Sequence, residues 1–374
     1  MSFRYGSGIN KPGFNPLAAQ TTTYTYELWS CGLNSNGQLG LGNVTAYSSP
    51  KQVGALTNWV GVDGQSNFTV ATKTDGTLWS WGRNVQGQLG LGNTTSYSSP
   101  KQVGALTAWS KVAVGQFHTI ATKTDGTLWS WGGNNHGQLG DGTTTNRSSP
   151  VQVGALTAWL KVACGNYHTL ATKTDGTLWS WGLGNAGQLG LGVTTYYSSP
   201  KQVGALTTWL NIAAGSYFTL ATKTDGAIWS WGSSTGGALG LGNATNYSSP
   251  KQVGALTTWL NIAAGSYFTL ANKTDGSLWS WGRNNVGQLG LGNTTDYSSP
   301  KQVGALTAWS KVAAGASFAL VIKTDETLWV WGNNTSGQLG LGDITSRSSP
   351  VQVGALTTWF MLAGGGAFTI ALKY

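Results

Sequence analysis

Residues 78–82 read LWSWG, and a close copy of this pentapeptide returns every 50 residues along the chain. The copies are LWSCG at 28–32, LWSWG at 128–132, 178–182 and 278–282, IWSWG at 228–232 and LWVWG at 328–332. The interval never changes, so the chain carries seven units without an insertion or a deletion. A fixed period of this length is typical of proteins built from repeated structural units, such as solenoids and propellers.

One unit reads as four short strands joined by turns. LWSWG, at 78–82, alternates side chains between the two faces of a sheet and leads into a long loop containing GQLGLG. SSPKQVGAL, at 98–106, follows, with its proline near the strand start, where a missing N–H is tolerated. WSKVAVG at 109–115 and TIATKT at 119–124 supply the last two strands, and the Asp-Gly pair after them is a strong hairpin signal.

Seven repeats of four antiparallel strands predict an all-β fold, a seven-bladed β-propeller. A single blade of this kind cannot bury both of its faces, whereas seven blades in a ring can. The repeats begin on the LWSCG strand and end on the strand that should precede it. We therefore expect residues 368–374 to pair with residues 24–31 in one composite blade that closes the ring, within a propeller domain at 24–374.

The composition narrows the class of protein and of partner. Only 9% of the 374 residues are charged, against an average of about 25% in soluble domains, and tryptophan occurs 20 times. The net charge of +9 suits an anionic partner or simple solubility. Because the tryptophans are too regular to be spared from packing, nucleic acid is not an expected partner. No apolar run approaches the ~20 residues of a membrane span, so membrane insertion is not expected.

The N-terminal segment MSFRYGSGINKPGFNPLAAQ lies outside the repeats. It lacks the apolar core of a signal peptide, so the chain is expected to stay cytoplasmic unless it becomes part of a virion. Its glycines and prolines discourage regular structure. We interpret residues 1–23 as an extension that could serve as a docking arm on a larger assembly.

Three stretches of one unit resemble the regulator of chromosome condensation repeat: WGRNVQGQLGLG at 81–92, SSPKQV at 98–103 and KVAVGQFHTIATKTDGTLWSWG at 111–132. The resemblance covers residues 24–374 and implies a seven-bladed propeller. Members of that family include an exchange factor for the Ran GTPase that also binds nucleosomes, and a plant ultraviolet-B photoreceptor.

Two departures from the family pattern argue against carrying those activities over. The resemblance implies a wedge-like insertion and a basic tail for exchange activity. No repeat here has an insertion, and residues 1–23 contain only Arg4 and Lys11 as basic residues. It implies a Gly-Trp-Arg-His-Thr motif for photoreception, but GQFHT at 115–119 lacks the tryptophan and the arginine.

Residues that break the repeat pattern do not form a catalytic set. His118 and His168 occupy a corner where other repeats have phenylalanine, and we interpret them as packed structural residues. Cys31 and Cys164 read as small packed residues. The aspartates mostly repeat in the TDG turn, and the few histidines lack metal-ligand spacing. We therefore expect a protein that is not an enzyme and that has no cofactor and no metal site.

Differences among the seven units gather in the loop after each WG, in the patch after each GLG and in the corner after the WSKVAVG strand. Strand alternation places these segments on one face, called the variable face below, and the constant GALT and TDG turns on the opposite face. Exposed, variable loops are where binding residues concentrate, although drift in loops that bind nothing remains an alternative. The candidate binding residues are Arg83, Asn84, Tyr97, Asn134, His136, Arg147, Tyr197, Tyr247, Arg283, Asn284, Tyr297, Asn333 and Arg347.

The sequence favours a binding or structural propeller. Nearly identical repeats rich in Gly, Ser, Thr and Asn suggest a bacteriophage or bacterial source. They also suggest a virion-associated tail, fibre or capsid-surface protein. Its expected partners are a host-surface glycan or protein and other virion proteins. The alternative is an intracellular interaction scaffold or an exchange-factor-like regulator of a small GTPase.

Overall fold

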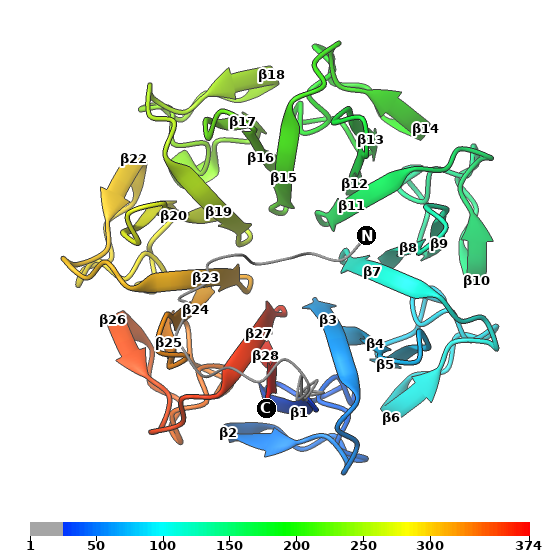
Figure 1. Cartoon of the computed structure of the whole chain (residues 1–374), viewed down its shortest axis with the longest axis horizontal. Coiled ribbons are helices and arrows are strands. Elements are labelled where there is room, and N and C mark those ends of the chain that lie inside the picture. Colours follow the sequence, from blue (N-terminus) through cyan, green and yellow to red (C-terminus); the bar gives the residue numbers. More distant parts are fainter. Residues whose placement is uncertain (1–24) are drawn as a thin grey trace, which may run out of the picture.

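The computed structural model describes residues 25–374 (Figure 1). In this part of the chain seven four-stranded antiparallel sheets stand as blades around a central axis, with one short 3-10 turn at Thr235–Gly237. The expected all-β, seven-bladed propeller is confirmed. The sequence prediction of a docking arm at residues 1–23 lies outside the described residues.

The first three blades follow the chain, and each runs from its innermost to its outermost strand. Blade 1 is β3 (Trp59–Gln65), β4 (Phe68–Lys73), β5 (Leu78–Gly82) and β6 (Tyr97–Gln102). Blade 2 is β7 (Trp109–Val114), β8 (His118–Lys123), β9 (Leu128–Gly132) and β10 (Arg147–Gln152). Blade 3 is β11 (Trp159–Cys164), β12 (His168–Lys173), β13 (Leu178–Gly182) and β14 (Tyr197–Gln202).

The next three blades repeat this order. Blade 4 is β15 (Trp209–Ala214), β16 (Phe218–Lys223), β17 (Ile228–Gly232) and β18 (Tyr247–Gln252). Blade 5 is β19 (Trp259–Ala264), β20 (Phe268–Lys273), β21 (Leu278–Gly282) and β22 (Tyr297–Gln302). Blade 6 is β23 (Trp309–Ala314), β24 (Phe318–Lys323), β25 (Leu328–Gly332) and β26 (Arg347–Gln352).

Blade 7 combines the two ends of the repeat region and closes the ring. Its strand order is β27 (Trp359–Gly364), β28 (Phe368–Lys373), β1 (Glu27–Gly32) and β2 (Tyr47–Gln52). The pairing of β1 with β28 runs from Glu27 opposite Lys373 to Gly32 opposite Phe368, which confirms the predicted closure. The salt bridge between Lys373 and Glu27, at 3.3 Å, lies at one end of this seam.

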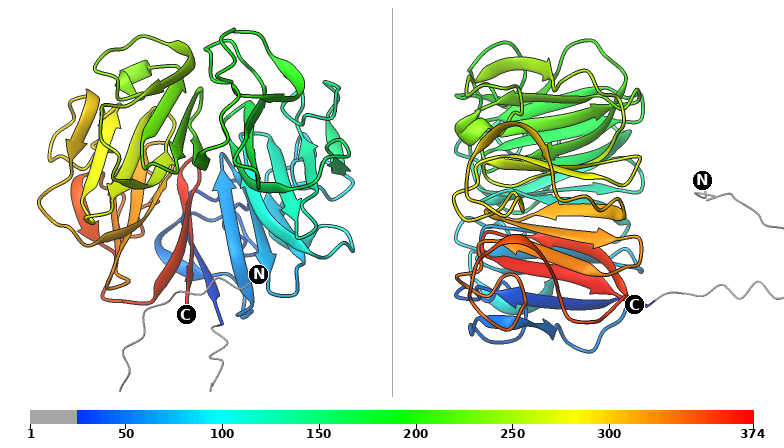
Figure 2. Two further views of the ribbon diagram at one scale, coloured as in Figure 1. Left: turned by 45° about the horizontal axis from the view of Figure 1, so that its top comes forward. Right: turned by 90° about the vertical axis from the view of Figure 1, so that its left-hand side faces the viewer.

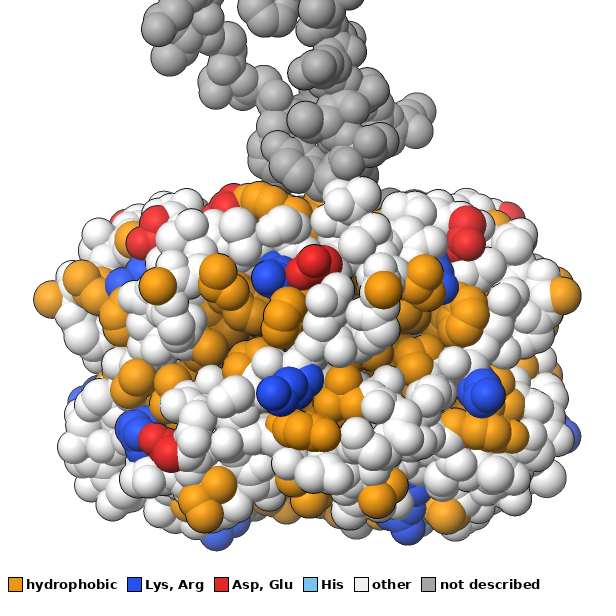
Figure 3. All heavy atoms as spheres, turned by 90° about the horizontal axis from the view of Figure 1, so that it is seen from below, with side chains coloured by type: hydrophobic (Ala, Val, Ile, Leu, Met, Phe, Trp, Pro, Cys, Tyr) orange, Lys and Arg blue, Asp and Glu red, His pale blue; other side chains and the backbone are white. Residues whose placement is uncertain are grey.

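Tryptophans fill the space between blades. In blade 2, Trp109 meets Trp129 and Trp131 edge to face, with ring centres 6.0 and 5.9 Å apart. Trp131 is fully buried, and its indole N–H donates to the carbonyl of Gln88 in the preceding blade at 3.0 Å. Figure 3 shows apolar side chains lining the grooves between neighbouring blades at the circumference. Blades are therefore held together by aromatic packing and by loop-to-indole hydrogen bonds.

The GQLGLG loop is part of this packing and is not a ligand site. Gly90 has a φ of +72°, a region that favours glycine, and a side chain there would come within 2.7 Å of the indole nitrogen of Trp131. Leu89, between the glycines, is fully buried. The loop therefore needs glycine both for its backbone conformation and for the close approach to the neighbouring blade.

The antiparallel order fixes which loops share a face. The corners between the first two strands of each blade and the long loops between the last two lie on the variable face. The TDG turns and GALT connections lie on the opposite side, called the basal face below. Figure 2 shows the resulting disc edge-on, with the C-terminus at the basal face.

Candidate recognition face

Three of the predicted binding residues are buried and hold loops instead. Asn84 is fully buried, its side-chain N–H groups donate to the carbonyls of Asn93 and Thr95 at 3.0 and 2.9 Å, and its Oδ1 accepts the Leu89 amide at 2.9 Å. Asn134 and Asn284 are equally buried and make the same kind of contacts. The prediction is corrected for these three asparagines, because none of them reaches the surface.

Six further candidates begin the outermost strands and lie at the rim of the disc, far from the channel: Tyr97, Arg147, Tyr197, Tyr247, Tyr297 and Arg347. Whether tyrosine or arginine stands at this position depends on a partner side chain in the same loop. Arg147 forms a salt bridge with Asp141 at 2.8 Å, and Arg347 pairs with Asp343 at 2.6 Å.

Where a candidate at this position is tyrosine instead of arginine, an asparagine stands four residues earlier, at the position that Asp343 holds before Arg347, in three of the four cases. The hydroxyl oxygens of Tyr97, Tyr247 and Tyr297 accept hydrogen bonds from Asn93, Asn243 and Asn293 at 3.4, 3.2 and 3.3 Å. In the fourth case Val193 stands in the partner position of Tyr197. The variation at the rim therefore reflects matched pairs inside loops.

The remaining four candidates lie nearer the channel. The guanidinium of Arg83 lies 5.3 Å from the ring centre of Phe117, and that of Arg283 lies 5.9 Å from the ring centre of Tyr267. His136 meets Tyr167 edge-on, with ring centres 5.2 Å apart. The fourth, Asn333, accepts the Thr335 amide at 2.9 Å and shapes its own loop.

The aromatic partners of these residues form one feature, called the aromatic arc below. It consists of Phe117, Tyr167, Tyr217 and Tyr267, at equivalent corners of blades 2 to 5. The first three have neighbouring ring centres 6.2 and 6.4 Å apart. All four side chains are partly exposed.

The other three blades carry Ser317, Ala367 and Asn67 at the same corner position. The arc therefore covers only part of the ring, and a nearly seven-fold scaffold presents an asymmetric surface. These corners vary in the sequence, but their aromatic residues were not among the predicted binding residues. The available signal was the change from Phe or Tyr to small residues within otherwise identical units.

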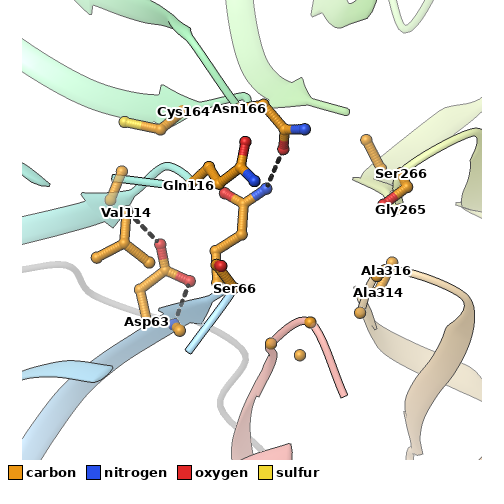
Figure 4. Close-up of a pocket in the computed structure, with 18 of the residues that line it drawn as sticks. Asp63, Ser66, Val114, Gln116, Cys164, Asn166, Gly265, Ser266, Ala314 and Ala316 are labelled. Carbon is orange, nitrogen blue, oxygen red and sulfur yellow. Dashed lines mark hydrogen bonds between the residues drawn. The ribbon is translucent and has the colours of Figure 1, made fainter. Parts of the chain in front are cut away.

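Inside the arc, the channel opens as a cavity of about 350 Å³ on the variable face (Figure 4). At one corner position the side chain becomes smaller from blade 2 to blade 7, with serine in both blades 4 and 5: Gln116, Asn166, Ser216, Ser266, Ala316 and Gly366. All of these except Ser216 line the mouth. Blade 1 carries Ser66 at that position, preceded by Gln65. The side-chain amide of Gln65 donates to Oδ1 of Asn166 at 3.3 Å, passing over blade 2.

Asp63 is the one acidic side chain among the described residues that line this mouth. Every other blade has alanine at its position. Its two oxygens accept the backbone N–H groups of Gly64 at 2.9 Å and of Val114, in blade 2, at 2.8 Å. Burial raises the pKa of Asp63 to about 7, and the two backbone donors oppose this shift only in part.

The position of Asp63 fills a gap in a ring of backbone contacts. Around the mouth, a backbone N–H of one blade donates to a carbonyl of the next, from Gln116 to Asn166 at 3.3 Å and onward to Ser66. Among the described residues this chain of bonds includes no link from Ser66 to Gln116. The Asp63 carboxylate joins blades 1 and 2 at that point (Figure 4).

The two corner histidines are structural, as expected. His118 and His168 are fully buried, and their Nε2 atoms lie 3.0 and 3.1 Å from the hydroxyls of Thr169 and Thr219 in the next blade. Burial lowers the pKa of both to about 3, with a further contribution from His168 to the shift of His118. Both are therefore neutral at physiological pH and join neighbouring blades.

The basal end of the channel differs from the mouth on the variable face in the side chains that line it. Its mouth is lined by Lys111, Lys161 and Lys311, together with Asn211 and Asn261. The ammonium of Lys161 donates to the Asn211 side chain at 2.7 Å, and that of Lys311 donates to a backbone carbonyl of blade 7 at 2.6 Å. The basal lysines thus serve partly as links between blades.

Two further observations concern the described residues alone. Within residues 25–374, no three His, Cys, Asp or Glu side chains are grouped as they would be around a metal ion. Over the same residues, no helix has the length and apolar character needed to cross a membrane.

The comparison with known families gives a match over nearly the whole chain. The family model "Regulator of chromosome condensation (RCC1) repeat" matches seven successive segments: 27–72, 75–122, 125–172, 175–222, 225–271, 275–322 and 325–372. A second model with the same description matches parts of five units, from 109–138 to 309–338. No curated protein matches this chain.

Solved structures share the architecture at low sequence identity. Yeast RCC1 (Prp20), crystallised with Kap60, superposes with a TM-score of 0.84 at 20% identity, covering 94% of this chain and 89% of that chain. Human WBSCR16 gives 0.83 at 21% identity, covering 93% and 98%. The Saccharomyces cerevisiae protein Prp20p, described with its binding to Gsp1p and histones, gives 0.84 at 20% identity over 94% and 92%. These likenesses concern the fold.

Proposed function

The chain belongs to the regulator of chromosome condensation (RCC1) repeat family, and on that premise we propose that it is a non-enzymatic propeller that binds a partner through its variable face. The aromatic arc and the channel mouth form the recognition surface. The single observation that carries the proposal is the asymmetry of this face. Seven nearly identical units differ at the corners that surround the channel.

The composition of the arc suits recognition. Tyrosine and arginine supply large, rigid contact areas at low entropic cost, and they are enriched at the energetic centres of interfaces. Arg83 and Arg283 lie on Phe117 and Tyr267 at the two ends of the arc. A partner that covers the arc would bury apolar rings beside two cations, so a polar or anionic rim on that partner would complement the surface.

A comparison of the two faces supports this choice. The basal face repeats GALT seven times, and its exposed leucines recur with each unit. A partner docked on the GALT connections would find seven equivalent positions and no unique one. The variable face offers one arrangement only, because the arc, the mouth gradient and Asp63 each occur once around the ring.

We place the protein on a virion, as a tail, fibre or capsid-surface component that contacts a host-surface glycan or protein. Support comes from the near identity of the repeats and their wealth of Gly, Ser, Thr and Asn. Mass spectrometry of purified particles checks this assignment. Detection at a constant ratio to a capsid protein supports it, and absence from particles made by cells that contain the protein contradicts it.

Substitution of the arc tests the recognition role. Ser317 shows that serine is accepted at the corner position, so the four-fold variant Phe117→Ser, Tyr167→Ser, Tyr217→Ser and Tyr267→Ser should keep the fold. The matched control replaces four exposed basal leucines by serine, Leu106, Leu156, Leu206 and Leu256. With the proteins as baits on the native source, the partner should be retained by wild type and by the basal variant and lost by the arc variant. Equal retention by the arc variant would refute the proposal.

An exchange factor for a small GTPase is the second candidate, since the similar structures include yeast RCC1 (Prp20), described with its binding to Gsp1p. The uniform repeat length speaks against it, because no unit carries an added segment. Release of labelled GDP from a panel of small GTPases separates the two candidates. Acceleration by wild type would favour exchange activity, and an unchanged rate across the panel would favour the binding role.

A further inference from the structure

We propose that the channel mouth on the variable face is a carbohydrate pocket, which takes the terminal neutral sugar of a glycan while the aromatic arc supports the sugars that follow. This inference rests on the proposed recognition role of that face and names the chemical class of its ligand. It depends on the mouth residues, which are distinct from the aromatic residues of the arc.

The mouth concentrates side-chain amides on one half of its circumference. Gln65, Gln116 and Asn166 come from three successive blades and line the cavity. Figure 4 shows the side chains of Gln116 and Asn166 there. An amide carries both donors and acceptors, and so does each sugar hydroxyl, so the two can exchange paired hydrogen bonds. The carbonyl oxygen of the Gln116 side chain is buried and has no hydrogen-bond partner within the described chain. A buried acceptor without a donor is unfavourable unless a ligand or water satisfies it.

The opposite half of the mouth leaves room for a ligand. Blades 6 and 7 present Ala316 and Gly366 where blades 2 and 3 carry long amides, and the arc position above them holds Ser317 and Ala367. The cavity of about 350 Å³ lies at the lower end of the range for small-molecule pockets and suits a single sugar ring. A ligand can therefore lie against small residues while its hydroxyls face the amides.

Asp63 adds an acceptor at the side of this pocket. Each carboxylate oxygen accepts one backbone N–H, from Gly64 and from Val114, and keeps a further lone pair for a ligand hydroxyl. The carboxylate accepts hydrogen bonds, and the hydroxyl groups of a sugar can donate them. In its ionised form Asp63 disfavours an anionic sugar at this position because like charges would meet.

The aromatic arc supplies the complementary contact. Sugars carry patches of C–H groups that pack on aromatic faces, and Phe117, Tyr167 and Tyr217 stand in succession outside the mouth. A protein partner would favour a flat patch of about 800 Å² per side with apolar anchors. The small polar recess inside the arc departs from that pattern, which is why the structure favours a glycan end here.

The experiment titrates wild type with a panel of free neutral sugars, namely glucose, galactose, mannose, rhamnose and N-acetylglucosamine, by ligand-observed NMR and calorimetry. At least one should bind with a dissociation constant in the millimolar range. The variant Gln116→Ala, Asn166→Ala should weaken that binding about tenfold, since each lost hydrogen bond is worth roughly 0.5–1.5 kcal/mol. Blade 6 carries alanine at the equivalent position, so this variant should fold. The control Gln202→Ala, an exposed glutamine on the rim strand β14, should bind as wild type does.

Each outcome decides the inference. No binding of any panel sugar by wild type at about 20 mM, well above millimolar affinity, overturns it, and so does equal binding by wild type and the mouth variant. If the arc variant loses a protein partner while no sugar binds, the carbohydrate inference falls and the recognition role stands. If a sugar binds and depends on Gln116 and Asn166 while the arc variant keeps its partner, the pocket stands and the role of the arc falls.

Discussion

Replacing the two buried histidines by the phenylalanine of the other blades should make the propeller resistant to acid. The substitution is His118→Phe together with His168→Phe, which introduces the residue that Phe68, Phe218 and Phe268 supply at the same corner. Both histidines are fully buried, and burial lowers the pKa of each from its ordinary 6.5 to about 3. Between these values the unfolded chain binds protons that the folded chain does not, so stability falls as the pH drops below about 6.5.

The magnitude follows from the shift. At pH 4.5 each histidine is about two pH units below its unfolded pKa and is still neutral in the folded chain, so each destabilises the fold by about 2.7 kcal/mol and the pair by roughly 5.4 kcal/mol. Tryptophan fluorescence in urea, at pH 7.5 and pH 4.5, measures the loss for wild type and variant. The variant should lose several kcal/mol less, because Asp63 and all other titrating groups are common to both proteins.

The reverse substitution provides the control. Phe218→His inserts a third histidine into the equivalent corner of blade 4, and the free energy of unfolding should fall by about 3 kcal/mol more than in wild type on going to pH 4.5. Equal losses for wild type, the double phenylalanine variant and Phe218→His would refute the reasoning. In that case neutral buried histidines would not be the source of the acid sensitivity.

Three further predictions concern single features. Wild type should lose stability as the pH rises from about 4 to 7, by up to ~1.4 kcal/mol per pH unit, because the raised pKa of Asp63 makes its ionisation unfavourable in the folded chain. The substitution Asp63→Asn should remove this loss. Thermal midpoints of both proteins at pH 5 and pH 8 measure the difference. Gly90→Ala should destabilise by more than about 2 kcal/mol, whereas Gly104→Ala, with positive φ and open space, should cost about 1 kcal/mol in urea unfolding. Arg347→Tyr should lower the thermal midpoint alone and recover when Asp343→Asn is added, since the pair then matches the loops that join tyrosine to asparagine four residues earlier.

The fold was predictable in detail because the sequence repeats it seven times. A constant 50-residue interval excludes insertions, and complementary ends indicate a closed ring. The observed seam between β1 and β28 follows from these two facts. The buried structural role of His118 and His168 was equally readable, since five sister units place phenylalanine there.

The sequence predicted which face of the propeller carries the candidate site, but it did not identify the residues of the site. Variation marked the correct end of each blade, but it did not separate exposed residues from residues that hold loops. Asn84 varies to glycine or serine in two sister units and is nevertheless fully buried. Tyr97 and Arg147 vary because their loop partners vary with them. Such matched changes need a three-dimensional contact to be recognised.

The channel mouth was the feature that the sequence predicted least well. The hydrogen bond from Gln65 to Asn166 joins residues 101 positions apart and skips a blade. The placement of Asp63 opposite the Val114 amide depends on the longer strand β3, which ends with Gln65 paired to Phe68. A period of 50 residues predicts contacts between adjacent units, so the hydrogen bond from Gln65 to Asn166 lies outside that rule. The bond from Val114 to Asp63 joins adjacent blades, but it depends on an aspartate that no other unit carries.

Hydrogen–deuterium exchange of the propeller with and without its isolated partner tests most directly whether the variable face is the recognition surface. We expect slower exchange at residues 115–119, 165–169, 215–219 and 265–269 and at loop 83–86, with no change at the GALT turns. Protection confined to the GALT and TDG turns, or spread equally over all seven blades, would contradict it.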